Sequence, residues 1–208
     1  GETCFEVSSI TSGLDTFTAS DSSDEVTFSQ TASVTFIASN PDADHSTFTP
    51  TIASVTADGV TTSRLIATLK TIDDNPVSGK TVTVNQTVGS DVTITPVTCL
   101  SGGITAGVSN DNGEACFDVS TTTAQSATFE ATDTTSNIVI SQTANVVFTA
   151  GIANADTPHS TVTADPTTIT ADGSSTSLVT VLVRDVYNNI VSGNNISLSK
   201  TSGPGNPT

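Results

Sequence analysis

Apolar and polar residues alternate with a period of two along most of the chain. In segment 63–72 (SRLIATLKTI), every second residue is apolar, and we predict that Leu65, Ala67 and Leu69 face a core. The equivalent positions of segment 177–186 are Val179, Val181 and Val183. Further alternating, β-branched runs lie at 80–84, 91–95, 115–120, 127–132 and 144–149. The pattern predicts short β-strands and no helix.

The chain also repeats itself. GETCFEVS at Gly1 recurs as GEACFDVS at Gly113, an offset of 112 residues. Segment 43–59 (ADHSTFTPTIASVTADG) recurs at 157–173 (TPHSTVTADPTTITADG) with an offset of 114 residues. A period of this length has the size of an ordinary domain. We therefore predict the C-terminal part of one repeat, one complete repeat and the N-terminal part of a third, at residues 1–40, 41–153 and 154–208.

Turn-forming clusters such as ADG, DDNPVSG and NDNG separate the predicted strands. About seven short strands in roughly 110 residues, without a helix, are typical of an immunoglobulin-like sandwich. The predicted fold class is therefore all-β, in the form of tandem immunoglobulin-like antiparallel β-sandwiches.

Two short polar segments, 39–44 (SNPDAD) and 153–158 (ANADTP), connect consecutive repeats. Each contains a proline, which favours a stiff connection over a flexible tether. Because a short stiff linker restricts how neighbouring sandwiches tilt, we expect an array of these repeats to behave as a rod.

The charge balance excludes some classes of partner. The chain has 208 residues, with 5 Lys and Arg against 21 Asp and Glu, for a formal net charge of −16. Nucleic-acid binding and attraction to anionic membranes both require a basic surface. No apolar run approaches the roughly 18 residues of a membrane span. We predict no nucleic-acid partner and no membrane insertion in this segment.

Several motifs in register with the repeat resemble the bacterial immunoglobulin-like domains of the intimin and invasin type. These are the Ala-Asp-Gly turn, the strand that follows it, the Asn-Pro-Val-x-Gly turn and the later Asn-Gly-x-Ala turn. Asp74 and Asn188 stand where that family usually has Gly, and Ile190 replaces the proline that Pro76 supplies. The resemblance implies an extracellular or cell-surface stalk, often of an adhesin, without catalysis.

The predicted function is that of a structural segment of an extracellular stalk or filament, acting as a stiff spacer. Its expected partners are neighbouring copies of the same repeat. The alternative is a ligand-binding adhesin module that recognises a receptor or glycan through its loops. Such a module should carry an aromatic or Arg cluster in one repeat. Tyr187 is the only Tyr and the Phe residues are scattered, so no cluster is evident. We do not expect an enzyme.

The three cysteines follow the repeat. Cys4 and Cys116 occupy the same repeat position, and Cys99 is the second cysteine of the complete unit. We predict a Cys99–Cys116 disulfide and expect Cys4 to pair outside this segment, since an extracellular sandwich permits disulfides. Two buried thiols in a reducing compartment are the alternative.

Two arrangements fit the order of the partial repeats. Gly1 corresponds to Gly113, and Thr208 corresponds to Ile94. A continuous array is the favoured expectation, because a free half-sandwich would leave apolar strands bare. The other arrangement is a subunit whose front part is completed by the back part of the next subunit, in a head-to-tail polymer.

No cofactor is expected, with calcium as the weaker option. Calcium requires several carboxylate and carbonyl oxygens in one cage. The acidic residues that could converge between repeats are Asp42, Asp44, Asp58, Asp156 and Asp172. No loop has regular calcium spacing, and plain solvated turns are the favoured interpretation. His45 and His159 open equivalent strands and are expected to pack against linkers or be exposed.

Two asparagines fit the acceptor pattern for N-linked sugar. They are Asn85, in Asn-Gln-Thr, and Asn195, in Asn-Ile-Ser. Two such matches are expected by chance in a Thr-rich chain, and both asparagines are candidates on this pattern alone. The many Thr residues also suit exposed strand positions through their β-branching.

Overall fold

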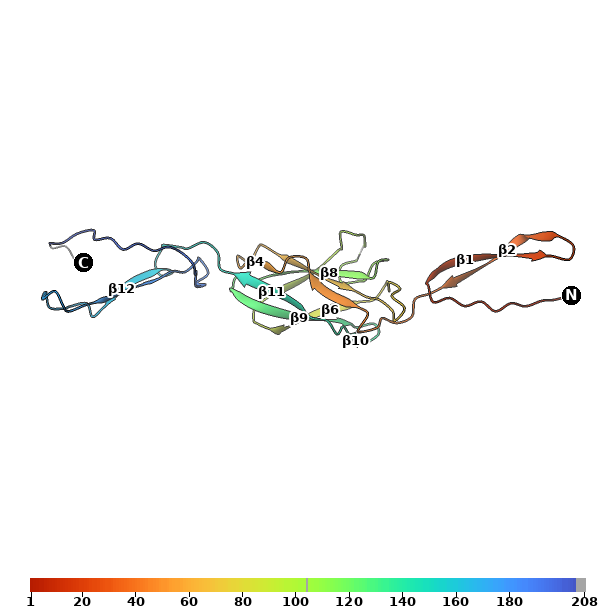
Figure 1. Ribbon diagram of the computed structural model, residues 1–208, viewed down its shortest axis with the longest axis horizontal. Coiled ribbons are helices and arrows are strands. Elements are labelled where there is room, and N and C mark those ends of the chain that lie inside the picture. The colour runs from red at the N-terminus through yellow and green to blue at the C-terminus, as the bar shows by residue number, and fades with distance from the viewer. Residues whose placement is uncertain (104, 205–208) are drawn as a thin grey trace.

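The structure is a computed structural model that describes residues 1–103 and 105–204. Within these ranges every regular element is a strand, and no helix is present that could cross a membrane. The molecule is elongated, with a central sandwich between two thinner segments and the chain termini at opposite ends (Figure 1). We call residues 1–40 the first segment, 41–153 the central unit and 154–208 the third segment.

The central unit has two facing sheets. One sheet has the order β3 (Thr47–Pro50), β5 (Ser63–Thr68), β8 (Glu114–Ser120) and β7 (Thr93–Val97). The other has the order β10 (Ile138–Val139), β9 (Gln125–Asp133), β11 (Ala144–Thr149) and β4 (Ser54–Thr56), and β6 (Val82–Val88) also pairs with β9. The predicted fold class, an immunoglobulin-like β-sandwich, is confirmed.

One strand pair departs from the predicted antiparallel pattern. β4 pairs with β11 in parallel, with Val55 opposite Phe148. The preceding strand β3 pairs antiparallel with β5 in the other sheet. The chain crosses between the sheets at Ile52 and Ala53, and the Val147 N–H donates to the Ala53 carbonyl at 2.9 Å. Because the chain keeps its direction as it changes sheets, β4 runs parallel to the last strand.

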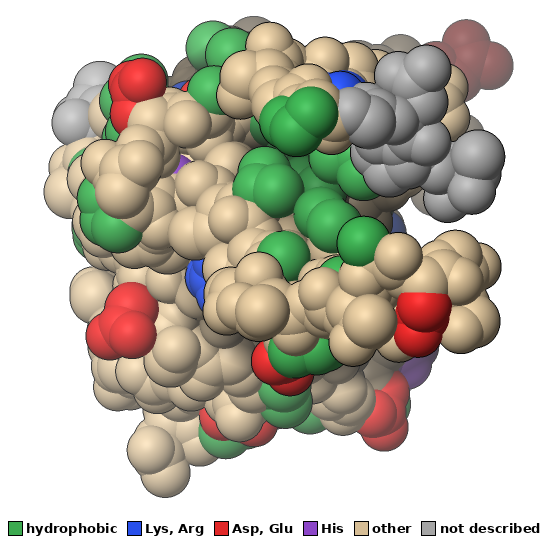
Figure 2. All heavy atoms as spheres, turned by 90° about the vertical axis from the view of Figure 1, so that its left-hand side faces the viewer, with side chains coloured by type: hydrophobic (Ala, Val, Ile, Leu, Met, Phe, Trp, Pro, Cys, Tyr) green, Lys and Arg blue, Asp and Glu red, His purple; other side chains and the backbone are tan. Residues whose placement is uncertain are grey.

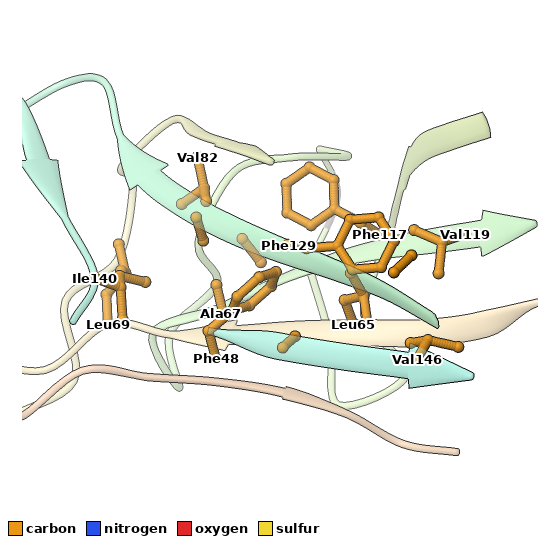
Figure 3. Close-up of a cluster of buried hydrophobic side chains, with 14 of the residues drawn as sticks. Phe48, Leu65, Ala67, Leu69, Val82, Phe117, Val119, Phe129, Ile140 and Val146 are labelled. Atoms are coloured by element: carbon orange, nitrogen blue, oxygen red, sulfur yellow. The ribbon is translucent and has the colours of Figure 1, made fainter. Parts of the chain in front are cut away.

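A cluster of apolar side chains fills the space between the two sheets (Figure 3). The predicted core face of β5 is confirmed, because Leu65 and Ala67 of the strand, and Leu69 just after it, are fully buried. Four aromatic rings anchor the cluster, each at most 2% exposed: Phe48, Phe117, Phe129 and Phe148. Arg64 lies on the opposite face of β5, where its Nε donates to Asp118 Oδ1 of β8 at 2.8 Å.

The two outer segments form antiparallel strand pairs with exposed apolar faces. β1 (Gly13–Asp21) pairs with β2 (Val26–Phe36), and β12 (Thr161–Asp165) pairs with β13 (Leu178–Leu182). Figure 2 shows apolar side chains gathered at the third-segment end of the molecule. Val179, a predicted core residue, is 39% exposed, and Val181 and Val183 are half-buried. The predicted core face is not covered here, because no counterpart of the second sheet lies among the described residues 154–204.

The turns that follow β5 and β13 explain why Asp74 and Asn188 can stand where the family usually has glycine. Asp74 and Asn188 occupy equivalent positions and have φ angles of 62° and 67°. Glycine adopts this left-handed conformation without strain, and Asp and Asn tolerate it better than other residues. The same backbone turn therefore forms in both repeats without glycine.

Candidate functional site at the unit junctions

The turn at residues 71–75 and its counterpart at 185–189 each project towards the preceding unit. We call them the junction turns. In the first, Thr71 Oγ1 accepts hydrogen bonds from the N–H groups of Asp73 and Asn75, at 3.3 and 3.2 Å. In the second, the carboxylate of Asp185 accepts from the N–H groups of Tyr187 and Asn189, both at 2.9 Å. The residue that opens each turn therefore holds its backbone in shape.

Asn189 connects the third segment to the central unit through its side-chain amide. Its Nδ2 donates to the carbonyl of Thr122 at 2.8 Å, and its Oδ1 accepts from the N–H of Ala124 at 2.7 Å. The residue is 9% exposed, so water competes poorly for either bond. One planar group thus binds two backbone positions of the neighbouring unit.

Asn75 makes the same contact between the central unit and the first segment. Its Nδ2 donates to the carbonyl of Ile10, and its Oδ1 accepts from the N–H of Ser12 at 3.2 Å. Ile10 and Ser12 are the repeat counterparts of Thr122 and Ala124. We call this paired contact the asparagine clasp, and it occurs at both junctions of the chain.

Both junctions have further contacts. At the first, Lys80 Nζ donates to Asn40 Oδ1 at 3.2 Å. At the second, the Tyr187 hydroxyl donates to the carbonyl of Asp58 in the central unit at 3.0 Å. Asp185 Oδ2 accepts from the Gly151 N–H at 2.9 Å and from Asn189 Nδ2 at 2.8 Å. Burial of Asp185 raises its pKa, but the hydrogen bonds from Asn189, Gly151 and Tyr187 outweigh this and leave the pKa below its usual value.

The linkers are also tied to the units that they enter. The Asp42 N–H donates to the carbonyl of Lys70 at 2.7 Å, and the Asn154 N–H donates to the carbonyl of Arg184 at the same distance. Asp42 Oδ1 accepts from His45 Nδ1 at 2.9 Å, which lowers the pKa of Asp42 and raises that of His45. These contacts shorten the free part of each connection.

Two of the acidic candidates for calcium, Asp58 and Asp172, hydrogen-bond within their own turns. Asp58 accepts from Thr61 and Val60, and Asp172 accepts from Ser175 and Ser174, and these bonds lower the pKa of both carboxyls. Asp44 accepts from the Ser141 hydroxyl at 2.5 Å, and the Asp156 carbonyl accepts from the His159 N–H.

These acidic residues do not converge. Asp58 contacts Tyr187 of the third segment, whereas Asp42 follows directly on the first segment in the chain. The two outer segments lie at opposite ends of the central unit (Figure 1). Across residues 1–103 and 105–204, no three His, Cys, Asp or Glu side chains form a group that could hold a metal ion. Within the described part of the chain, the candidate residues therefore do not form a cage of calcium ligands.

The cysteines and the candidate glycosylation sites lie apart from the junction turns. Cys99, which follows β7, is joined to Cys116 of β8 in a disulfide with a sequence separation of 17 residues. Cys4 is exposed and is not joined to another cysteine of this chain. Asn85 and Asn195 are both exposed, and sugar attachment there stays a prediction.

Sequence reasoning did not identify Asn75, Asn189 or Tyr187 as contact residues. The one available signal was that the same Asn ends the turn in both repeats, while the residues around it differ. Tyr187 gave no signal, because its partner is a backbone carbonyl whose position depends on how the two units are oriented.

Comparisons with known proteins agree with this architecture. Residues 156–208 match a family described as invasin, domain 3. The solved structure of invasin, described as a bacterial integrin-binding protein, is similar with a TM-score of 0.61 and 25% identity, over 88% of this chain and 34% of that one.

Two further solved structures support the fold. InvD of Yersinia pseudotuberculosis has a TM-score of 0.61 and 18% identity, over 87% of this chain and 52% of that one. The Escherichia coli adhesin FdeC has a TM-score of 0.56 and 20% identity, over 78% of this chain and 48% of that one. The chain thus spans about a third to a half of the length of these structures. A comparison with curated proteins finds no match. The sequence motifs, the sandwich and these similarities together support the resemblance of the chain to the bacterial immunoglobulin-like domains of the intimin and invasin type.

Proposed function

We propose that this chain is a stiff spacer in the extracellular stalk of an adhesin-like bacterial surface protein. The observation that carries the proposal is the asparagine clasp, which binds each unit to the one before it at both junctions. A stalk must hold a distant part of the protein away from the cell, so its joints must resist bending. The partners of each unit are then its neighbouring repeats.

The contacts on both sides of each linker support this role. Asp42 and Asn154 bind the strand ends of the units that they enter, while Asn75 and Asn189 reach back to the units that precede them. Two separate attachment points restrict both bending and rotation at a joint, whereas a linker alone restricts neither fully. The role requires no cofactor and no catalytic residue.

A ligand-binding role is the alternative, since the similar solved structures include an integrin-binding protein and an adhesin. The two roles can be separated in the polypeptide that carries this segment, displayed on bacteria. Replacing residues 41–153 with an unrelated immunoglobulin-like domain of similar length should preserve adhesion to host cells if the unit is a spacer.

Two outcomes would contradict the spacer role. One is loss of adhesion after the replacement, at equal surface display. The other is saturable binding of the purified 208-residue chain to host cells or to a glycan array. Either result would favour recognition through the loops.

A further inference from the structure

We infer that Asn75 and Asn189 are positioning residues that set the orientation of each unit on the preceding one. We also infer that the residues at the first and third positions of the junction turn set how firmly that orientation is held. The inference rests on the proposed spacer function and assigns to individual side chains the stiffness that a spacer requires.

The chemistry of the clasp requires an amide. The side chain of Asn189 donates to the carbonyl of Thr122 and accepts from the N–H of Ala124, so both its functions are used. A carboxylate can only accept and an ammonium group can only donate, whereas an amide does both in one plane. Two bonds from one plane to two points on the neighbour oppose rotation about the long axis of the chain, which one bond would permit.

The amide is also held on its own side. Asp185 accepts from the backbone N–H of Asn189 and from its Nδ2, at 2.9 and 2.8 Å. Thr71 receives the corresponding bonds from Asn75, at 3.2 and 3.5 Å. Asp185 uses its second oxygen to bind Gly151, whereas a hydroxyl has one oxygen for all of these partners. The clasp is therefore held more firmly in the second junction turn.

The residue at the third position of the junction turn also differs between the two junctions. Tyr187 donates to the carbonyl of Asp58 across the second junction. Its counterpart in the first turn is Asp73, whose carboxylate cannot donate to a carbonyl. The second junction therefore has contacts that the first turn cannot make with its own residues. We infer that stiffness varies from joint to joint and follows the Thr-Asp or Asp-Tyr identity of the turn.

Backbone amide exchange measured by NMR on the 208-residue chain tests the clasp directly. Asn189→Ala should accelerate exchange of the Ala124 N–H roughly tenfold, because loss of a buried hydrogen bond exposes the donor to water. The Ser12 N–H should not change, and Asn75→Ala should produce the reverse pattern. Each variant is thus the control for the other, and unchanged exchange at Phe117 reports that the central core is intact.

Residual dipolar couplings on the same samples test whether the second junction is stiffer than the first. The wild-type chain should show a narrower spread of orientations at the second junction than at the first. Tyr187→Phe removes only the hydroxyl. It should increase the spread of orientations at the second junction, by less than Asn189→Ala does. Asn189→Asp keeps the acceptor and loses the donor. It should therefore increase the spread of orientations at the second junction, while the Ala124 N–H stays partly protected from exchange.

Specific results would overturn the inference. A wild-type Ala124 N–H that exchanges as fast as a loop amide, or an Asn189→Ala chain with unchanged exchange and orientation, would exclude the clasp. Equal spreads of orientation at the two junctions would exclude the inferred difference in stiffness. Loss of adhesion after replacement of residues 41–153, with the exchange results as expected, would instead remove the spacer function and leave the clasp in place.

Discussion

The central unit and the third segment begin with the same strands in the same register, yet among the described residues only the central unit has a core. Phe48 lies opposite Ala67 in the central unit, and their counterparts Val162 and Val181 lie opposite each other in the third segment. Phe48 is fully buried, whereas Val162 is 65% exposed. Strand pairing is thus a property of the first two strands, while burial depends on the second sheet.

The first segment shows the same difference from the other end of the repeat. Phe17 pairs with Ala32, as Phe129 pairs with Ala144 in the central unit. Phe17 is 37% exposed, whereas Phe129 is fully buried. A hydrophobic strand face therefore predicts which side chains can enter a core, and the presence of a facing sheet decides whether they do.

Truncation of a core residue should separate the two regions most strongly. Leu65→Ala leaves a cavity in the central sandwich and should lower its free energy of unfolding by about 2–5 kcal/mol. Val179→Ala, at the equivalent position, should cost less than about 1 kcal/mol because its side chain is already partly in water. Guanidinium unfolding followed by circular dichroism measures both, and equal losses would refute the distinction between the regions.

The cysteines provide the next test. Replacing Cys99 and Cys116 together by Ser should destabilise the central unit by about 3 kcal/mol, because the cross-link restricts the unfolded chain. The fold should persist, since the sandwich core lies elsewhere. Cys4→Ser, at the repeat position of Cys116, should leave the melting temperature unchanged. A comparable fall in both variants would show that Cys4 has a structural role in this chain.

A smaller effect is expected on the outer face of β5. Arg64 and Asp118 form a two-point ion pair there, and the counterpart of Arg64 in the third segment is Leu178. Arg64→Leu should therefore cost the central unit about 1 kcal/mol. A double-mutant cycle with Asp118→Asn isolates the coupling between the two side chains. A coupling free energy near zero would mean that the ion pair does not contribute to stability.

The smallest effect concerns pH at the junctions. The pKa of Asp185 is lowered from 3.8, so its stabilising contribution is present above that value and is lost as the pH falls through the lower folded-state pKa. Thr71 does not titrate, so the asparagine clasp of the first junction is not held by a carboxylate that acid could neutralise. Carbon-13 shifts of the Asp185 carboxyl should titrate with a midpoint below 3.8, and the Ala124 amide should follow. Movement of the Ser12 amide with the same midpoint would contradict the difference between junctions.

Much of the fold could be predicted from the sequence because it depends on neighbours along the chain. Alternation in segment 63–72 predicted the buried face of β5, since side chains two residues apart share one face. The repeat register singled out Cys99 and Cys116 as the two cysteines of one unit. The junction turns were recognised as turns, although the positive φ of Asp74 and Asn188 was not anticipated.

The candidate site could not be predicted in the same way. The contact of Tyr187 with Asp58 joins residues 129 positions apart, and its existence depends on the orientation of two folded units. The parallel pairing of β4 with β11 and the separation of Asp42 from Asp58 likewise follow from the path of the chain between sheets. The sequence by itself determined the strands, their faces and the repeat, because these follow from local periodicity. Only the tertiary structure decided which faces are buried and which side chains meet across a junction, because both depend on elements that are distant in sequence.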